Sequence, residues 1–166
     1  MRTSWLIGDR MVDSFLFFGL IADTHGLMRP EALDALKKAD LIIHAGDIGK
    51  PAVLDGLQNL APVRAIRGNN DRDPWALSLP THDSVTIGAH TLYVLHDLKE
   101  LALDPRASGF SVVVSGHSHK PEVRTLNQVL FVNPGSAGPR RFILPVTVAM
   151  LALRSDRCAA SIIQLM

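Results

Sequence analysis

Residues 15–26 read FLFFGLIADTHG, an apolar run that ends in an aspartate, a threonine and a histidine. The run does not alternate between apolar and polar residues, so it predicts a strand that is buried on both faces of a sheet. Such strands are typical of α/β proteins. A glycine follows the histidine and indicates a turn where the strand ends.

The segments that follow alternate between helical and strand patterns. Residues 29–39 and 51–60 predict helices, each with a proline (Pro30, Pro51) near its start, and residues 40–47 and 62–68 predict strands. This β-α-β-α-β succession requires parallel strands joined by right-handed crossovers. The second half is richer in strands; we expect a hairpin over 83–97, a short helix over 99–108, a strand over 109–116, a hairpin over 122–133, and strands over 145–154 and 158–166.

The composition limits the classes of protein to consider. A formal net charge of +1 gives no electrostatic reason to expect binding to nucleic acid or to an anionic membrane. The single cysteine, Cys158, excludes an internal disulfide and favours a cytoplasmic location. No stretch is long and apolar enough to span a bilayer. We expect one domain over 14–166; residues 1–13 are expected to be a disordered extension or to reflect a start codon placed upstream of Met11.

Polar side chains follow five of the apolar runs, in the segments IADTHG, HAGD, RGNND, VLHD and VSGHSH. Each has a local explanation: the aspartates could cap helices, the asparagine could occupy a turn, and the histidines could be ordinary strand-end or surface residues. Core packing, however, does not require such residues at all five strand ends. In open α/β sheets these ends converge on one crevice. The seven candidate metal ligands are Asp23, His25, Asp47, Asn69, His96, His117 and His119.

This ordered series of motifs resembles the calcineurin-like metallophosphoesterase superfamily, and the NPGS segment at 133–136 resembles its small bacterial and archaeal phosphodiesterases. The resemblance implies a four-layer α-β-β-α sandwich of two mixed sheets flanked by helices. It also implies that Asp23, His25, Asp47 and His119 hold one metal ion, and that Asp47, Asn69, His96 and His117 hold a second, with Asp47 bridging.

Two bridged ions suit a phosphodiesterase in which a hydroxide between them attacks the phosphate. We therefore expect Asp47, Asn69 and His96 to be catalytic. An oxygen- and imidazole-rich site suits Mn²⁺ first, with Fe²⁺, Ni²⁺, Zn²⁺ or Mg²⁺ as alternatives. Arg72 and Arg140 are the candidate substrate-binding residues, because a guanidinium group matches phosphate in a bidentate fork. The expected substrate is a small phosphodiester or nucleotide-like molecule, and the family resemblance leaves a homo-oligomer open.

Asn70 departs from the pattern of many superfamily members, which carry a histidine at this position that protonates the leaving group. An asparagine cannot donate a proton at useful pH, so we expect diesters with good leaving groups to react best. Two other interpretations stay open. One is a non-catalytic metal-binding scaffold, as in the eukaryotic retromer subunit with this fold, and the other is a nuclease, which the absence of a basic stripe disfavours.

Overall fold

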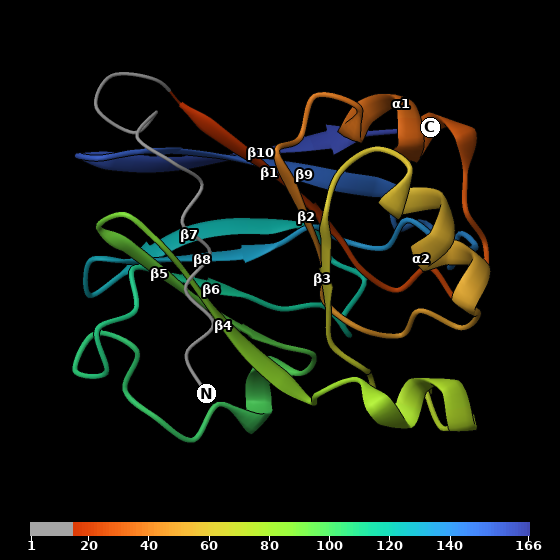
Figure 1. Ribbon diagram of the computed structural model, residues 1–166, viewed down its shortest axis with the longest axis horizontal. Coiled ribbons are helices and arrows are strands. Elements are labelled where there is room, and N and C mark those ends of the chain that lie inside the picture. Colours follow the sequence, from red (N-terminus) through yellow and green to blue (C-terminus); the bar gives the residue numbers. More distant parts are fainter. Residues whose placement is uncertain (1–14) are drawn as a thin grey trace.

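Two five-stranded sheets packed face to face form the body of the protein (Figure 1). The computed structural model describes residues 15–166, so the predicted extension over 1–13 lies outside the described residues. The first sheet has the order β10 (Arg157–Gln164), β9 (Thr147–Arg154), β1 (Leu16–Ile21), β2 (Leu41–His44) and β3 (Val63–Ala65). The second has the order β4 (His82–Ile87), β5 (His90–Leu95), β6 (Val112–Val114), β8 (Val129–Asn133) and β7 (Glu122–Leu126).

Both sheets are mixed. In the first sheet β1, β2 and β3 are parallel, while β9 pairs antiparallel with both β1 and β10. In the second sheet β5, β6 and β8 are parallel, and the hairpins β4–β5 and β7–β8 add antiparallel edges. The predicted parallel β-α-β-α-β succession is confirmed. Its crossovers are α1 (Pro30–Leu36) and α2 (Pro51–Gln58), and each begins at its proline.

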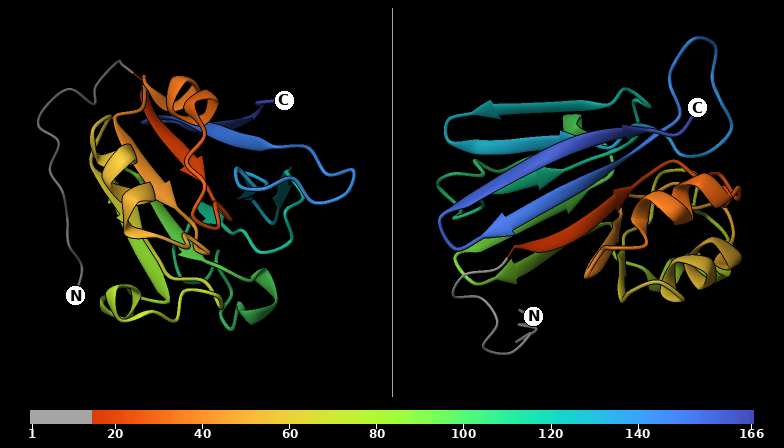
Figure 2. Two further views of the ribbon diagram at one scale, coloured as in Figure 1. Left: turned by 90° about the vertical axis from the view of Figure 1, so that its right-hand side faces the viewer. Right: turned by 90° about the horizontal axis from the view of Figure 1, so that it is seen from above.

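Three apolar layers hold the sandwich together. Phe18, Leu92 and Leu151 are fully buried in the layer between the sheets. Leu36 of α1 and Leu57 of α2 pack in a second layer on the outer face of the first sheet, so both helices cover that face (Figure 2). On the outer face of the second sheet, a third and smaller layer includes Leu98 and Leu101. The predicted fold class, an α/β sandwich of two mixed sheets, is therefore confirmed.

The layer outside the second sheet contains less helix than expected. The prediction of a helix over 99–108 is wrong, because only Leu98–Glu100 form a short 3-10 helix, η2, and turns follow. Pro105 lies inside the predicted helix, where it has no N–H to donate and disfavours helical geometry in the residue before it. The Asp104 carboxylate instead accepts a hydrogen bond from the Ala107 N–H, which stabilises a local turn. A second 3-10 helix, η1 (Pro74–Ser78), lies in the loop before β4.

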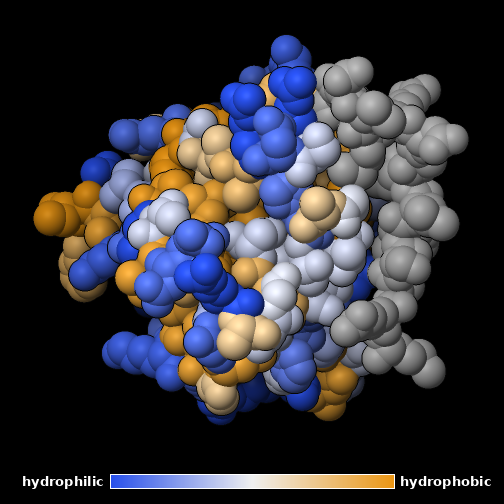
Figure 3. Space-filling view, turned by 90° about the vertical axis from the view of Figure 1, so that its left-hand side faces the viewer, coloured by the Kyte–Doolittle hydropathy of each residue, from blue (hydrophilic) through white to orange (hydrophobic). Residues whose placement is uncertain are grey.

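The loop between β8 and β9 exposes two large apolar side chains. Phe142 is 94% exposed and Ile143 is 89% exposed. This loop extends beyond the sheets in the right panel of Figure 2, and apolar atoms project from the left edge of the face shown in Figure 3. Among residues 15–166, no helix is long and apolar enough to cross a membrane.

Candidate metal centre

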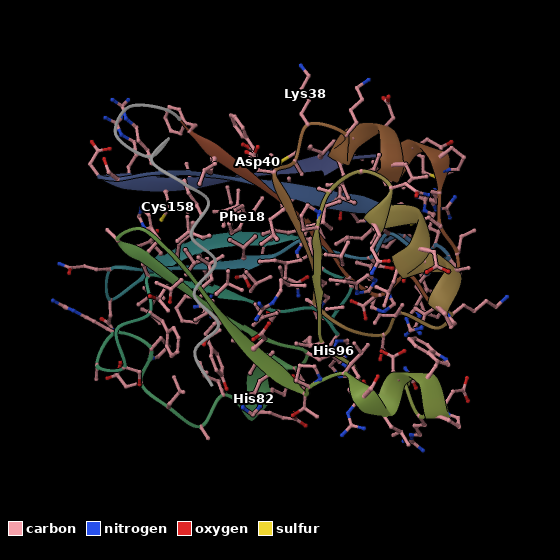
Figure 4. The ribbon with its side chains drawn as sticks, in the orientation of Figure 1. Phe18, Lys38, Asp40, His82, His96 and Cys158 are labelled. Atoms are coloured by element: carbon pink, nitrogen blue, oxygen red, sulfur yellow. The ribbon has the colours of Figure 1, made fainter. Side chains whose placement is uncertain are left out.

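Five of the seven predicted ligands converge where strands of both sheets end. Asp23 follows β1 and Asp47 follows β2, while His96 directly follows β5; Figure 4 places His96 at the end of the molecule away from Cys158. The Asp23 Oδ1 atom lies 3.4 Å from Nε2 of His119 and 3.8 Å from Nε2 of His96. His25 lies 4.0 Å from both carboxylates through its Nε2 atom. The carboxyl ends of parallel strands lie at one edge of a sheet. Here that edge of the first sheet lies beside the same edge of the second sheet.

The ligand atoms form two overlapping groups, Asp23–His25–His119 and Asp23–Asp47–His96, and within each all atoms lie within 4.8 Å of one another. Asp23 belongs to both groups. Asp47 Oδ2 is also close to both, at 3.4 Å from His96 Nε2 and 4.0 Å from His25 Nε2. Asp23 therefore shares the central position that the sequence analysis gave to Asp47.

Unpaired polar atoms in this cluster fit a divalent cation. Asp23 Oδ1 and His96 Nε2 are buried without a hydrogen-bond partner, although buried polar atoms nearly always have one. The Nε2 atoms of His25 and His119 face each other at 3.3 Å. His96 Nδ1 lies 2.7 Å from the Ala45 carbonyl oxygen, to which it can only donate, so Nε2 of the neutral ring is free to bind a metal. The oxygen and imidazole donors present fit such an ion.

The backbone at the predicted ligands adopts a conformation that is uncommon for residues with side chains. Left-handed φ angles occur at Asp23 (54°), His25 (47°), Asp47 (55°), His117 (68°) and His119 (60°). Such conformations cost free energy and concentrate at functional sites. The capping explanation also fails, because the residues at the N-caps of α1 and α2 are Arg29 and Lys50. The aspartates are oriented toward the cluster by turns rather than by helix ends.

The other two predicted ligands border the cluster without packing into it. The His117 ring centroid is 5.2 Å from that of His96, but the His117 side chain is 43% exposed. Asn69 is exposed, and its carbonyl oxygen accepts a hydrogen bond of 3.0 Å from Arg72 Nε. Asn69 and His117 line a hollow of about 370 Å³ beside the cluster, together with His96. The structure thus brings five donors into contact and places two at their edge.

Asn70 contacts the cluster directly. Its backbone N–H donates to Asp47 Oδ1 at 3.0 Å, and its side-chain amide donates to Asp47 Oδ2 at 2.8 Å. Burial raises the pKa of the Asp47 carboxyl, but the His96 ring, with Nε2 at 3.4 Å from Asp47 Oδ2, and hydrogen bonds from Asn70 outweigh burial and hold that pKa below its usual range. Burial likewise lowers the pKa of His96, but the neighbouring Asp47 carboxylate and Ala45 carbonyl raise it to about 9.

His44 is excluded as a ligand by its own hydrogen bonds. Its Nδ1 atom accepts from the Gly46 N–H at 3.2 Å, so Nε2 carries the proton and donates to the Thr24 hydroxyl at 2.9 Å. That hydroxyl donates in turn to the Ile48 carbonyl oxygen at 2.8 Å. Burial lowers the pKa of His44 to about 3, so the ring is neutral. His44 therefore ties together the two turns that carry Asp23 and Asp47.

Asp71 is the residue that the sequence analysis missed. Its buried carboxylate accepts backbone N–H groups of Ile48 at 3.0 Å, Gly49 at 3.0 Å and Gly68 at 2.9 Å. These bonds join the turn after β2 to the turn after β3. The only sequence signal was an acidic residue directly after Asn70. Such a position gives no indication that the carboxylate bonds to a segment more than twenty residues away.

The predicted substrate-binding arginines lie on different segments of the chain. Arg72 and Arg67 line the hollow beside Asn69, which also contains the carboxylates of Asp71, Asp97 and Glu100. Arg140 is exposed on the loop between β8 and β9.

The neighbouring Arg141 acts on the cluster through its charge. Burial lowers the pKa of His25, the two aspartates oppose that shift, and the positive charge of Arg141 adds to it. Arg141, which with Arg67, Arg72 and Arg140 is one of the arginines that the sequence offers for binding phosphate, thus lies within electrostatic reach of His25.

A sandwich of two mixed sheets with carboxylates and imidazoles gathered at the strand ends defines a class of α/β proteins with a candidate metal centre. The profile of the calcineurin-like phosphoesterase superfamily domain matches residues 16–156, and the chain belongs to this family. A probable metallophosphoesterase of Methanothermobacter thermautotrophicus is 33% identical over 161 residues, which cover 90% of this chain and 92% of that protein. A probable metallophosphoesterase of Methanocaldococcus jannaschii is 34% identical over 147 residues, covering 81% and 72%.

Solved structures show the same fold at lower identity. A novel archaeal phosphodiesterase superposes with a TM-score of 0.75 at 22% identity, covering 89% of this chain and all (100%) of that one. Vacuolar protein sorting 29 from Cryptosporidium parvum superposes with a TM-score of 0.71 at 21% identity, covering 92% and 98%. Family membership supports a hydrolase of phosphate esters and implies divalent metal ions, with candidate ligands in the cluster described above.

Proposed function

We propose that the protein is a binuclear metal-dependent phosphodiesterase that acts on a small phosphodiester or nucleotide-like substrate. The observation that carries the proposal is the position of Asp23 Oδ1, which is buried and unpaired within 4.0 Å of three imidazole Nε2 atoms. Asp47 Oδ2 adds a second carboxylate oxygen within 4.0 Å of two of them. Two anionic side chains between two sets of imidazoles suit a pair of cations better than a single one.

The proposed allocation of ligands is the one that the family resemblance implies. Asp23, His25 and His119 would hold one ion and Asp47, Asn69, His96 and His117 the other, with Asp47 shared. Bound ions would supply an activated hydroxide and offset the charge on the phosphoryl oxygens. Mn²⁺ remains the first expectation for the ion, and a cytoplasmic location the expectation for the protein.

The protein's own groups orient the reaction. Asn70 holds both oxygens of Asp47, and the Ala45 carbonyl fixes the His96 ring, so neither group has to reorganise when substrate binds. Arg72 and Arg140 are the proposed phosphate-binding residues, and the charge of Arg141 favours an anion on the His25 side.

Asn70 supports the preference for good leaving groups. Its side-chain amide is committed to Asp47 and has no proton to give, so the leaving group receives no general acid from this position. We expect aryl phosphodiesters to react faster than alkyl phosphodiesters. An Asn70→His variant should accelerate the reaction of alkyl esters more than that of aryl esters; equal rates for the variant and the original protein would contradict this explanation.

The test is hydrolysis of bis(p-nitrophenyl) phosphate by metal-stripped protein, with and without added Mn²⁺. The control variant is Asp47→Asn, which keeps the shape of the side chain and removes its charge. We expect Mn²⁺ to restore turnover in the original protein and not in the variant. Comparison with p-nitrophenyl phosphate, which has the same leaving group, separates diesterase from monoesterase activity. Faster turnover of the monoester would refute the diesterase assignment.

A second candidate function is a metal-binding scaffold without turnover. The fold that this protein shares with vacuolar protein sorting 29 is compatible with it. Every predicted ligand position carries a competent donor, which favours the enzyme. Stoichiometric binding of metal with no turnover of either ester, with any of the five candidate ions, would favour the scaffold.

A further inference from the structure

His117 is the least enclosed of the histidines around the metal centre. Its side chain is 43% exposed, compared with 6% for His96 and 4% for His119. The backbone of His117 is fixed, because its N–H donates to Asp23 Oδ2 at 3.0 Å. The ring, by contrast, makes no hydrogen bond to residues 15–166. Something other than packing must orient it if it is to bind an ion.

Asp97 is placed to orient the His117 ring. It lies at the N-cap of η2, where its Oδ1 atom accepts the Lys99 N–H at 3.0 Å. Its other oxygen, Oδ2, lies 3.6 Å from His117 Nε2. A charge-assisted hydrogen bond would need this distance to shorten to about 2.8 Å, which a small rotation of the exposed ring can supply.

The contact uses one ring nitrogen and leaves the other for the metal. With Nε2–H directed to Asp97, the lone pair of the neutral ring is on Nδ1. Carboxylates that accept the second N–H of a metal-binding histidine fix its tautomer and its orientation. Asp97 and His117 also form the common wall of two hollows beside the centre, of about 370 Å³ and 810 Å³. The pair thus lies between two hollows that border the metal centre.

We propose that Asp97 is a positioning residue for His117 and thereby sets the affinity of the metal ion on the Asp47–His96 side. The inference rests on the proposed binuclear centre and adds a residue outside its ligand set. An ion held by Asp23, His25 and His119 would not depend on Asp97, because the ligand atoms of these three residues lie together without it. The two ions should therefore differ in their sensitivity to a substitution at Asp97.

The test is titration of the metal-stripped full-length protein with Mn²⁺ by isothermal calorimetry. We expect two ions to bind, and Asp97→Asn to weaken one of them by about 10- to 100-fold while leaving the other unchanged. His117→Ala should weaken the same ion. In the His117→Ala background, Asp97→Asn should add less than about a twofold effect, because the residue through which Asp97 acts is gone. Asp104→Asn, which removes another exposed carboxylate from the same connection, is the matched control and should change neither ion.

A second variant separates positioning from the capping of η2. Asp97→Ser can still accept the Lys99 N–H but cannot reach His117, so it should weaken the same ion as Asp97→Asn without lowering the melting temperature. If Asp97→Ser bound both metal ions with the affinity of the original protein, Asp97 would serve only to cap η2, and the proposal would be overturned. The proposal would also be overturned if the losses of metal affinity in Asp97→Asn and His117→Ala multiplied in the double variant. Asp97 would then be a metal ligand itself or would affect metal affinity independently of His117. Uptake of a single ion by the original protein would refute the binuclear centre, whereas two ions without coupling would refute only the role of Asp97.

Discussion

Asp71 offers a direct test of how the metal centre is held together. In Asp71→Asn, one oxygen can still accept two of the three backbone N–H groups, but the new amide directs N–H toward the third donor. Hydrogen bonds to a charged acceptor contribute about 1.5–3 kcal/mol each and neutral ones about 1 kcal/mol. Weakening two bonds and losing the third should lower the free energy of unfolding by about 3–5 kcal/mol.

Urea denaturation of the metal-free protein, followed by far-UV circular dichroism, measures this loss without a contribution from metal binding. Asp73→Asn is the matched control, since Asp73 is exposed and its side chain makes no capping bond to η1. The control should change the free energy of unfolding by less than about 0.5 kcal/mol. Equal unfolding midpoints for the two variants would refute the proposed role of Asp71.

Three further predictions follow from the centre and the surface. Because Asp47 and the Ala45 carbonyl raise the pKa of His96 to about 9 although burial opposes this, the ring is protonated at neutral pH and must lose its proton to bind metal. The apparent affinity for Mn²⁺ should then rise by about tenfold per pH unit from about pH 7 to about pH 9 and level off above, with proton release detectable by calorimetry in buffers of different ionisation enthalpy. Gly68→Ala should abolish tight metal binding in the same titration, because its Cβ atom would overlap Asp47 Oδ1 and lie 2.5 Å from Asp47 N. Replacing Phe142 and Ile143 with serine should change the free energy of unfolding by less than about 0.5 kcal/mol, because both side chains are already exposed to solvent.

Each of these predictions has a contrary outcome. An Mn²⁺ affinity that stays flat between about pH 7 and about pH 9 would mean that His96 binds metal without losing a proton. Gly56→Ala is the control for Gly68→Ala. Gly56 lies inside α2, and a Cβ atom added there meets only Met28 Cγ, at 3.4 Å, so this variant should stabilise the helix by up to about 1 kcal/mol. Phe18→Ala, in the fully buried layer between the sheets, should cost about 3–5 kcal/mol, so a similar loss at Phe142 and Ile143 would show that their loop is packed in solution.

The parts of the fold with strong local signals were predictable. The runs at β1 and β2 are apolar without alternation, and α1 and α2 each begin at a proline, so the order of these elements followed from the chain itself. The helix predicted over 99–108 failed because a favourable helical composition was outweighed by Pro105 in its interior.

The candidate site was predictable as a set of residue types but not as an arrangement. Asp23, Asp47 and His96 stand at strand ends, and the topology of parallel strands brings such ends together. The role of Asp71 could not be inferred, because its carboxylate bonds to backbone groups in a distant segment. The role proposed for Asp97 could not be inferred either, because its distance to His117 depends on how the chain folds.

The sequence by itself determined where the strands, α1 and α2 form and which side chains stand where the strands end, because hydrophobic pattern and turn residues act over a few neighbouring positions. Only the tertiary structure decided that five donors meet closely while Asn69 and His117 stay at the edge. It also decided that Asp23 shares the centre with Asp47 and that Asn70 holds the Asp47 carboxylate. These outcomes depend on how two sheets pack face to face, and that packing is fixed by contacts between residues far apart in the chain.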